Sequence, residues 1–289
     1  MKRPTFDLQS HSRHSDGALE PADVVRAAAA AGVELLALSD HDTVDGVPEA
    51  VAAGPAAGVR VVPAAELSAV HDHWEDLHVL GYEIDVADAT LAERLAGART
   101  DRELRAEKMA ARLRDLGWDV DDTQIVARRE AGSPIGRPHL ASAVIDHPAN
   151  AERLATEHVG DVSAFIPAYL IPGAPAYLSR TRPTVAEAIG WVHDAGGVAI
   201  WAHPFWDIES PKRVLAALDD FVALGLDGVE AFYATFTREQ TLRLVDAAAD
   251  RDLLTTGSAD FHGPAHRMFS RFRAFQLYGQ EPRLGPIGA

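Results

Sequence analysis

Cysteine is absent from this sequence of 289 residues. Its absence excludes disulfides, cysteine-type zinc sites and a thiol nucleophile. Positive charge is also scarce, because 27 Lys and Arg residues stand against 43 Asp and Glu residues and give a formal net charge of −16. A surface that grips long nucleic acid or an anionic membrane needs clustered positive charge, so we expect neither partner. A small phosphorylated substrate is compatible with this charge, because a bound metal ion reverses the field locally.

Long apolar runs are absent as well. No stretch of the sequence approaches the roughly 20 apolar residues that cross a membrane. Residues 1–7 contain no apolar signal region. Hydrophobic residues make up 47% and charged residues 24% of the chain, as is typical of a folded globular protein. We therefore expect a cytoplasmic protein, and the sequence leaves its oligomeric state open.

Short apolar runs alternate with helix-like stretches in two parts of the chain. Strand-like runs cover residues 5–8, 33–39, 59–64, 77–83, 198–203, 228–232 and 253–257. Helix-like stretches cover residues 21–31, 48–57, 185–195, 211–224 and 238–251. This alternation predicts parallel strands joined by crossover helices, and about seven strands suggest an α/β fold of the (β/α) barrel type.

The middle of the chain breaks this rhythm. Residues 91–116 have apolar side chains at roughly helical spacing, and short helical pieces follow without a comparable strand. We predict a barrel domain formed by residues 1–95 and 174–289, and a helical insertion, or cap domain, formed by residues 96–173.

Histidine and carboxylate side chains gather at the ends of the predicted strands. They are Gln9, His11 and Asp16 after the first strand, Asp40 and His41 after the second, Glu66 after the third, His78 in or at the start of the fourth, His203 after the fifth, and Asp260 and His262 after the last. Barrel active sites form on the loops at the carboxyl ends of the strands, so these residues should converge at one mouth. Imidazole nitrogens and carboxylate oxygens together bind zinc, manganese or iron, and a bridging carboxylate can hold two ions.

Several motifs in this order resemble the PHP (polymerase and histidinol phosphatase) superfamily. They are DLQSHS at 7–12, SDG at 15–17, LSDHD at 38–42, ELS at 66–68, HVLGY at 78–82, AHP at 202–204 and GSADFHG at 257–263. The motif GRPH at 136–139 resembles the branch that includes nucleoside 3′,5′-bisphosphate phosphatases and short-RNA 5′→3′ exoribonucleases. The resemblance implies a distorted seven-stranded barrel of PHP type with two or three divalent ions, Mn, Zn, Fe or Mg.

Carried over residue by residue, the resemblance implies three metal positions. They are position 9 with His11, Glu66 and Asp260; Glu66 as a bridge with His78 and His203; and Asp16 with His41 and His262. The family usually has histidine where this chain has Gln9, and a neutral amide oxygen is the weaker ligand. Asp40 is expected to orient one of the histidines through a hydrogen bond.

The substrate contacts implied by the resemblance lie in and after the insertion. Arg137 offers a planar fork to phosphate oxygens, and His139 binds phosphate or donates a proton to the leaving oxygen. Arg180 is expected as a further phosphate contact. Trp206 and Tyr233 follow strand ends, where ordinary packing is the favoured interpretation and stacking on a base is the alternative.

Together these features predict a metal-dependent phosphoesterase, a hydrolase in which Glu66 takes part in catalysis and the metals activate water. The expected substrate is a nucleoside 3′,5′-bisphosphate or a short 5′-phosphorylated oligonucleotide. A histidinol-phosphate-type phosphatase shares the metal site and is one alternative. An inactive metal-binding or regulatory module, suggested by Gln9, is another.

Overall fold

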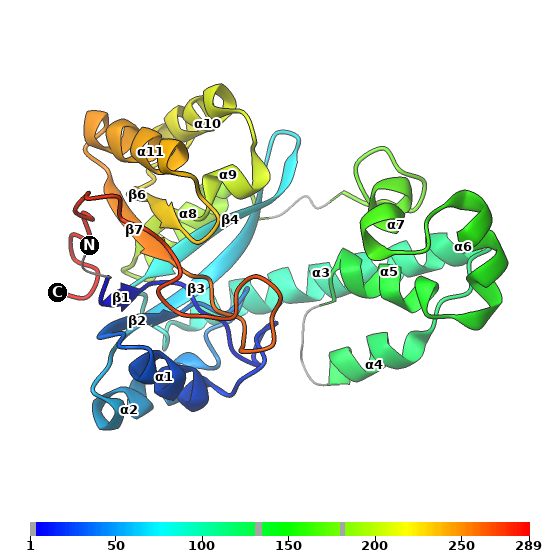
Figure 1. The fold of residues 1–289 in the computed structure, drawn as a ribbon, viewed down its shortest axis with the longest axis horizontal. Helices are drawn as coiled ribbons and strands as arrows, with labels where there is room; N and C mark the ends of the chain where they lie inside the picture. The colour runs from blue at the N-terminus through cyan, green and yellow to red at the C-terminus, as the bar shows by residue number, and fades with distance from the viewer. Residues whose placement is uncertain (1–3, 131–134, 180–182) are drawn as a thin grey trace. The chain divides into compact units, whose positions relative to one another are not determined.

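A computed structural model describes residues 4–130, 135–179 and 183–289 of the chain. The chain divides into two compact units, one formed by Met1–Ala96 with Arg182–Ala289 and the other by Gly97–Thr181. Figure 1 labels their helices and strands. We call the first the barrel unit and the second the helical unit.

Among the described residues, seven strands of the barrel unit form one sheet in sequence order. They are β1 (Phe6–Asp7), β2 (Leu35–Leu38), β3 (Arg60–His71), β4 (Trp74–Tyr82), β5 (Val198–Trp201), β6 (Gly228–Tyr233) and β7 (Leu254–Ser258). Just beyond β1, the Leu8 amide donates to the Gly257 carbonyl at 3.2 Å, and the His11 amide donates to the Phe261 carbonyl at 2.8 Å. The first and last strands therefore meet, and the predicted α/β barrel is confirmed as a nearly closed one.

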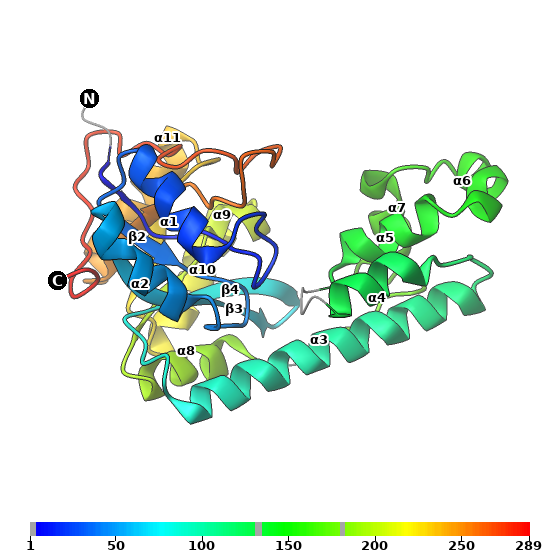
Figure 2. The ribbon, with the colours of Figure 1, turned by 90° about the horizontal axis from the view of Figure 1, so that it is seen from below.

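Helices cover the outside of this barrel. They are α1 (Pro21–Ala30), α2 (Val47–Ala57), α8 (Val185–Asp194), α9 (Pro204–Asp207), α10 (Pro211–Ala223) and α11 (Arg238–Asp250). Figures 1 and 2 both show α1 and α2 side by side near β2. Proline begins α1 and α10 at a position where its fixed φ favours the helix. Each helix buries an apolar stripe, as α10 does with Val214, Leu218 and Phe221.

The expectation that all strands are parallel is wrong at β4. This strand pairs antiparallel with both β3 and β5. Only two residues, Asp72 and His73, separate β3 from β4, and so short a connection forms a hairpin and not a crossover. Because β3 continues to His71, Glu66 lies inside this strand, whereas the sequence pattern predicts a strand that ends before it.

The helical unit has its own core. Its elements are α3 (Ala89–Asp115), which begins in the barrel unit, α4 (Asp122–Glu130), α5 (Arg137–Ile145), a 3-10 helix (Pro148–Asn150), α6 (Ala151–Glu157) and α7 (Val162–Tyr169). Trp118 is buried against Phe165, with ring centroids 5.4 Å apart. Ala176 and Tyr177 also belong to this core, beyond residue 173, where the sequence pattern predicts the insertion to end.

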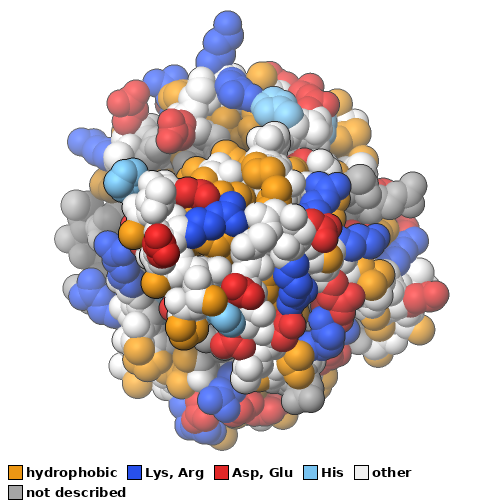
Figure 3. Space-filling model, turned by 90° about the vertical axis from the view of Figure 1, so that its right-hand side faces the viewer, with side chains coloured by type: hydrophobic (Ala, Val, Ile, Leu, Met, Phe, Trp, Pro, Cys, Tyr) orange, Lys and Arg blue, Asp and Glu red, His pale blue; other side chains and the backbone are white. Residues whose placement is uncertain are grey.

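The surface is mixed in charge. Figure 3 shows one face of the molecule, where Lys and Arg side chains are interspersed with Asp and Glu and no broad region has a single sign. Exposed ion pairs such as Arg153 with Glu157, 2.6 Å apart, are part of this pattern. Within the described ranges, no helix is both long and apolar enough to span a bilayer.

Candidate metal centre

Eight of the predicted ligands converge in the barrel unit. They are His11, Asp16, His41, Glu66, His78, His203, Asp260 and His262. Three overlapping groups of side chains have donor atoms close enough to hold a metal ion: His11, Asp16, His41 and His262; His41, Glu66 and His78; and His11, Glu66 and Asp260. His11 and His41 each belong to two groups, so the groups cannot simply be counted as three ions.

Glu66 stands at the middle of this cluster. Its Oε1 lies 2.8 Å from His78 Nδ1 and 3.0 Å from His203 Nε2. Its Oε2 lies 3.2 Å from His11 Nε2 and 3.5 Å from His41 Nδ1. Each carboxylate oxygen thus faces a different pair of imidazoles, which is the arrangement that a bridging carboxylate requires.

The hairpin that was not expected explains how His78 reaches this carboxylate. In the register between β3 and β4, Glu66 pairs with Leu80 and Ser68 pairs with His78. Alternate residues of a strand point to the same face, so His78 lies diagonally across from Glu66 on that face.

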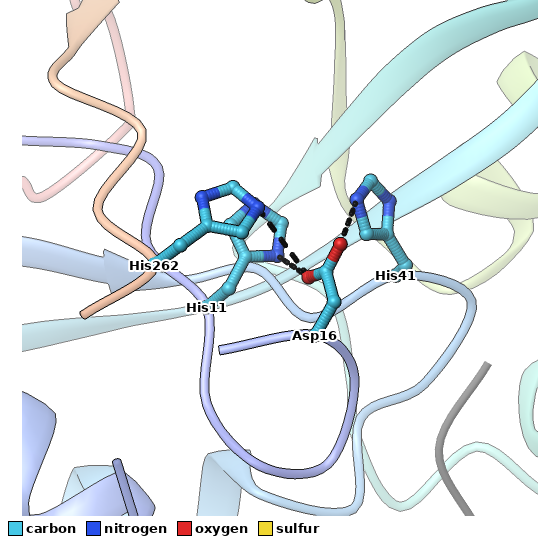
Figure 4. Close-up of side chains that lie close together, drawn as sticks. All are labelled: His11, Asp16, His41 and His262. Atoms are coloured by element: carbon cyan, nitrogen blue, oxygen red, sulfur yellow. Dashed lines mark ion pairs between the residues drawn. The ribbon is translucent and has the colours of Figure 1, made fainter. Parts of the chain in front are cut away.

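Asp16 is surrounded by three imidazoles, as Figure 4 shows. Its Oδ1 lies 3.6 Å from His11 Nδ1 and 3.4 Å from His262 Nε2, and its Oδ2 lies 3.6 Å from His41 Nε2. The ring of His11 stacks on that of His262, with centroids 4.2 Å apart. These separations are longer than typical hydrogen bonds. They place four side chains that can each offer one ligand atom to a metal ion close together.

Buried atoms that form no hydrogen bond show that this cluster fits a metal ion. His11 Nε2, His41 Nδ1 and Asp260 Oδ1 are buried and form no hydrogen bond. A buried polar atom without a hydrogen bond is costly. His11 Nε2 lies 3.0 Å from Asp260 Oδ1, and all three residues belong to the metal-capable groups. A divalent ion coordinated by them would remove that cost.

The protonation states of several of these groups also suit ligation. Burial opposes charge on Asp16 and Glu66, yet the surrounding histidines, His41 foremost, hold both pKa values well below the ordinary range. Burial works against Asp260 too, but His262 and His11 hold its pKa at about 2. Burial lowers the pKa of His41 to about 4, while the Glu66 and Asp16 carboxylates act in the opposite direction.

Asp40 binds serines and not the histidine that the sequence suggested. Its Oδ1 accepts the Ser12 amide at 2.7 Å and the Ser15 hydroxyl at 2.5 Å, and its Oδ2 accepts the Ser12 hydroxyl at 2.6 Å. These bonds fix the loop that carries His11 and Asp16. Gly17 closes that loop, and a Cβ there would lie 2.2 Å from the His11 carbonyl oxygen, so a larger residue does not fit.

Two residues of β6 support the cluster in roles that the sequence did not suggest. Glu230 was not among the candidates, and Tyr233 was expected to pack or to stack on a base. The Tyr233 hydroxyl donates to Asp260 Oδ2 at 2.7 Å. Glu230 accepts the His203 amide at 2.9 Å and the Ser258 hydroxyl at 2.6 Å, and burial raises the pKa of this carboxyl to about 8. The available signal was a glutamate in the middle of an otherwise apolar strand.

Three of the nine non-glycine residues with positive φ in the described part of the chain lie around the same centre. Asp42, His203 and Asp260 have φ values of 53°, 27° and 55°. Side chains other than glycine rarely adopt such angles, and they persist where surrounding contacts enforce them, often at functional sites. Asp42 is held by the Ser68 amide, which donates to its Oδ1 at 2.8 Å.

Gln9 is oriented differently from the expectation that its amide oxygen binds a metal. Its Nε2 donates to Glu66 Oε2 at 2.9 Å, and its Oε1 faces the Ser258 hydroxyl at 3.3 Å. The amide nitrogen has no lone pair available for an ion. In this arrangement Gln9 orients the Glu66 carboxylate, and its amide nitrogen, not its oxygen, faces that carboxylate.

Replacing Gln9 with histidine should tighten the binding of one ion. An imidazole beside His11 and Glu66 adds a nitrogen donor where the present residue offers an N–H group. We expect a roughly 10-fold gain in affinity, the lower end of what changes around a metal produce. Manganese titration into metal-stripped Gln9→His and wild-type protein measures it. Gln276→His, which adds a histidine at an exposed position, is the control; equal affinity in all three proteins would remove position 9 from the metal centre.

The predicted phosphate-binding residues are part of the helical unit. Arg137 begins α5, and His139 occupies the third position of this helix. The Gly136 amide donates to His139 Nδ1 at 2.9 Å, so the neutral ring carries its proton on Nε2. Arg180 lies outside the described residues.

Comparison with known proteins extends over nearly the whole chain. A family model described as PHP domain matches residues 7–125. The 3′,5′-nucleoside bisphosphate phosphatase of Chromobacterium violaceum is 33% identical over 263 residues, which cover 90% of this chain and 87% of the relative. A 5′-3′ exoribonuclease of Haemophilus influenzae is 32% identical over 265 residues, with 90% of each protein covered.

Solved structures agree with the fold. An amidohydrolase from Chromobacterium violaceum, crystallised with sulfate and no metal, matches with a TM-score of 0.76 at 31% identity, covering 91% of this chain and 89% of the other. A protein from Bifidobacterium adolescentis assigned as a metal-dependent phosphoesterase matches with a TM-score of 0.73 at 29% identity, covering 92% and 91%.

Proposed function

Because this chain belongs to the PHP domain family and is a metal-dependent phosphoesterase, we propose that it hydrolyses a phosphate ester of a small nucleotide. The proposed substrate is a nucleoside 3′,5′-bisphosphate or a short 5′-phosphorylated oligonucleotide. Enzymatic activity is the common feature of the named relatives, so the alternative of an inactive module is set aside.

The observation that carries this proposal is the overlap of three metal-capable groups, two of which share Glu66 and the third of which shares His11 and His41 with them. We propose that these groups hold two or three divalent ions, of Mn, Zn, Fe or Mg. Such ions supply a water that ionises near neutral pH and offset charge on phosphate oxygens. Tyr233 holds the Asp260 carboxylate in place through a hydrogen bond. Ser12 and Ser15 bind Asp40, and these bonds hold the loop that carries His11 and Asp16.

The size of the substrate is inferred from charge and from the relatives. A net charge of −16 and a mixed-charge face disfavour a long polyanion, which is bound through clustered cations. One relative is named for a nucleoside bisphosphate and another for RNA. A substrate of one to a few nucleotides agrees with both names.

We assign Arg137 and His139 to the substrate phosphate. Arginine presents a planar pair of N–H donors to phosphate oxygens. His139 contributes its Nε2–H group, while its Nδ1 accepts the Gly136 amide. Protonation at Nδ1 would break that bond, so phosphate binding suits this histidine better than the proton donation that the sequence suggested.

Arg137→Ala should lower kcat/KM. The expected loss of transition-state stabilisation is about 1.5–3 kcal/mol, the scale of a charge-assisted hydrogen bond. This corresponds to a loss of roughly 10- to 100-fold with unchanged metal content. Arg114→Ala, which removes an exposed arginine of the same unit, is the matched control. If the Arg137 variant matches wild type on every ester that is turned over, Arg137 does not contact the substrate.

Parallel assays of three substrates test the proposed function. Adenosine 3′,5′-bisphosphate, a 5′-phosphorylated tetranucleotide and histidinol phosphate are compared under Mn²⁺, Mg²⁺, Fe²⁺ and Zn²⁺. We expect turnover of one or both nucleotides to exceed that of histidinol phosphate. A preference for histidinol phosphate would establish the alternative phosphatase, and a ladder of products from the tetranucleotide would identify an exonuclease.

A further inference from the structure

An aromatic surface adjoins the metal centre. We call it the aromatic platform and define it by Trp206, Tyr233 and Phe269. Tyr233 and Phe269 are buried, with exposed fractions of 3% and 8%, whereas 48% of Trp206 is exposed. The Trp206 ring lies 5.6 Å from the Phe269 ring and 6.4 Å from the Tyr233 ring, measured between centroids. The platform therefore supports part of the indole and leaves the rest open.

Each member of the platform is tied to a candidate metal ligand. The Trp206 amide donates to the His203 carbonyl at 2.8 Å. The Tyr233 hydroxyl donates to Asp260, and the Phe269 carbonyl accepts the His262 amide at 2.9 Å. Phe269 also lies 5.6 Å from the His262 ring, so two ring contacts separate Trp206 from the metal centre.

Local packing does not account for the exposed indole. Helix α9 has four residues and begins directly after His203. Its Phe205 is 7% exposed and packs on Phe236, while the larger aromatic residue beside it remains half-exposed. Met268, in the loop that follows His262, is 49% exposed. Large apolar side chains left open beside a reactive centre are typical of ligand contacts.

We propose that Trp206 stacks on the base of the nucleotide whose phosphate occupies the metal centre. Indole offers a flat apolar face to a planar ring, and such stacking tolerates different bases. The proposal rests on the proposed nucleotide substrate and adds a base-binding subsite to it. Trp206 binds the part of the substrate that does not react, so it acts on KM and leaves kcat unchanged.

A base-free substrate separates this role from a structural one. Trp206→Ala should raise KM for adenosine 3′,5′-bisphosphate by about 10- to 100-fold, as expected for one lost base stack. Neither kcat for that substrate nor the kinetics of ribose 3,5-bisphosphate should change. Trp206→Phe should recover most of the affinity. Leu224→Ala is the control. It removes an apolar side chain of similar exposure, 40%, at the carboxyl end of α10, which precedes β6.

Binding measured by fluorescence tests the subsite even without turnover. Adenosine 5′-monophosphate, added with Mg²⁺, should quench wild-type tryptophan emission more than ribose 5-phosphate does, and the difference should vanish in Trp206→Phe. Two results would overturn the subsite. One is a difference in quenching between the two ligands that is the same in wild type and Trp206→Phe. The other is a KM increase in Trp206→Ala that is as large for ribose 3,5-bisphosphate as for adenosine 3′,5′-bisphosphate. Absence of nucleotide hydrolysis alongside base-dependent quenching would instead overturn the proposed reaction and leave the subsite supported.

Discussion

Glu66→Gln should bind less metal and lose nearly all phosphoesterase activity, by at least about 10²-fold. Glu66 has one oxygen toward His78 and His203 and the other toward His11 and His41. Glutamine of the same size replaces one of these oxygens with an N–H donor, so it cannot bridge two ions. Metal content after dialysis and kcat, measured together, provide the test.

The fold should survive this substitution, because Glu66 belongs to the polar centre and not to the apolar core. Glu66→Asp, which keeps the charge but shortens the reach, should retain metal at only one side. Glu239→Gln, on the exposed face of α11, controls for the loss of one negative charge. Full metal content in Glu66→Gln would disprove the bridge.

Most of the barrel was predictable because its elements carry periodic signals. Apolar runs bounded by glycine and proline predicted β2, β5, β6 and β7 to within a few residues. Most of the ligand positions agree with a rule of geometry, since residues after parallel strands meet at one end of a barrel, but Glu66 and His78 lie inside β3 and β4. The resemblance of the motifs added which of these residues belong together.

What the sequence did not reveal depends on contacts between distant segments. The apolar run at 59–64 ends before Glu66, yet β3 continues to His71, because both of its faces are buried around Glu66. The direction of the Gln9 amide is set by Glu66 and Ser258, which are 57 and 249 positions away. No local pattern encodes such a partner.

Replacing Asp7 with alanine should destabilise the barrel unit by about 2–5 kcal/mol. Asp7 Oδ1 accepts the Ala259 amide at 2.8 Å, and its Oδ2 accepts the Arg273 amide at 2.7 Å. Alanine leaves both donors without this partner, and each unmade buried hydrogen bond costs about 1–3 kcal/mol. Urea unfolding measures the loss, and Asp23→Ala, at an exposed acidic residue of α1, is the control. An unchanged midpoint would show that neither amide depends on Asp7.

The contribution of Asp7 should also depend on pH. Burial raises the pKa of this carboxyl from 3.8 to about 7, so between these values the folded protein holds a proton that the unfolded chain has released. The stability that protonated Asp7 contributes is therefore fully present below pH 4 and is lost as the pH rises through 7. We expect wild type to lose about 2–3 kcal/mol more than Asp7→Asn between pH 5 and pH 8, measured with a chelator present so that metal binding does not contribute. Asparagine cannot ionise, and the other titrating groups are common to both proteins, so the difference between the two curves isolates Asp7. Parallel curves would mean that the two amide donors keep Asp7 ionised throughout this range despite its burial.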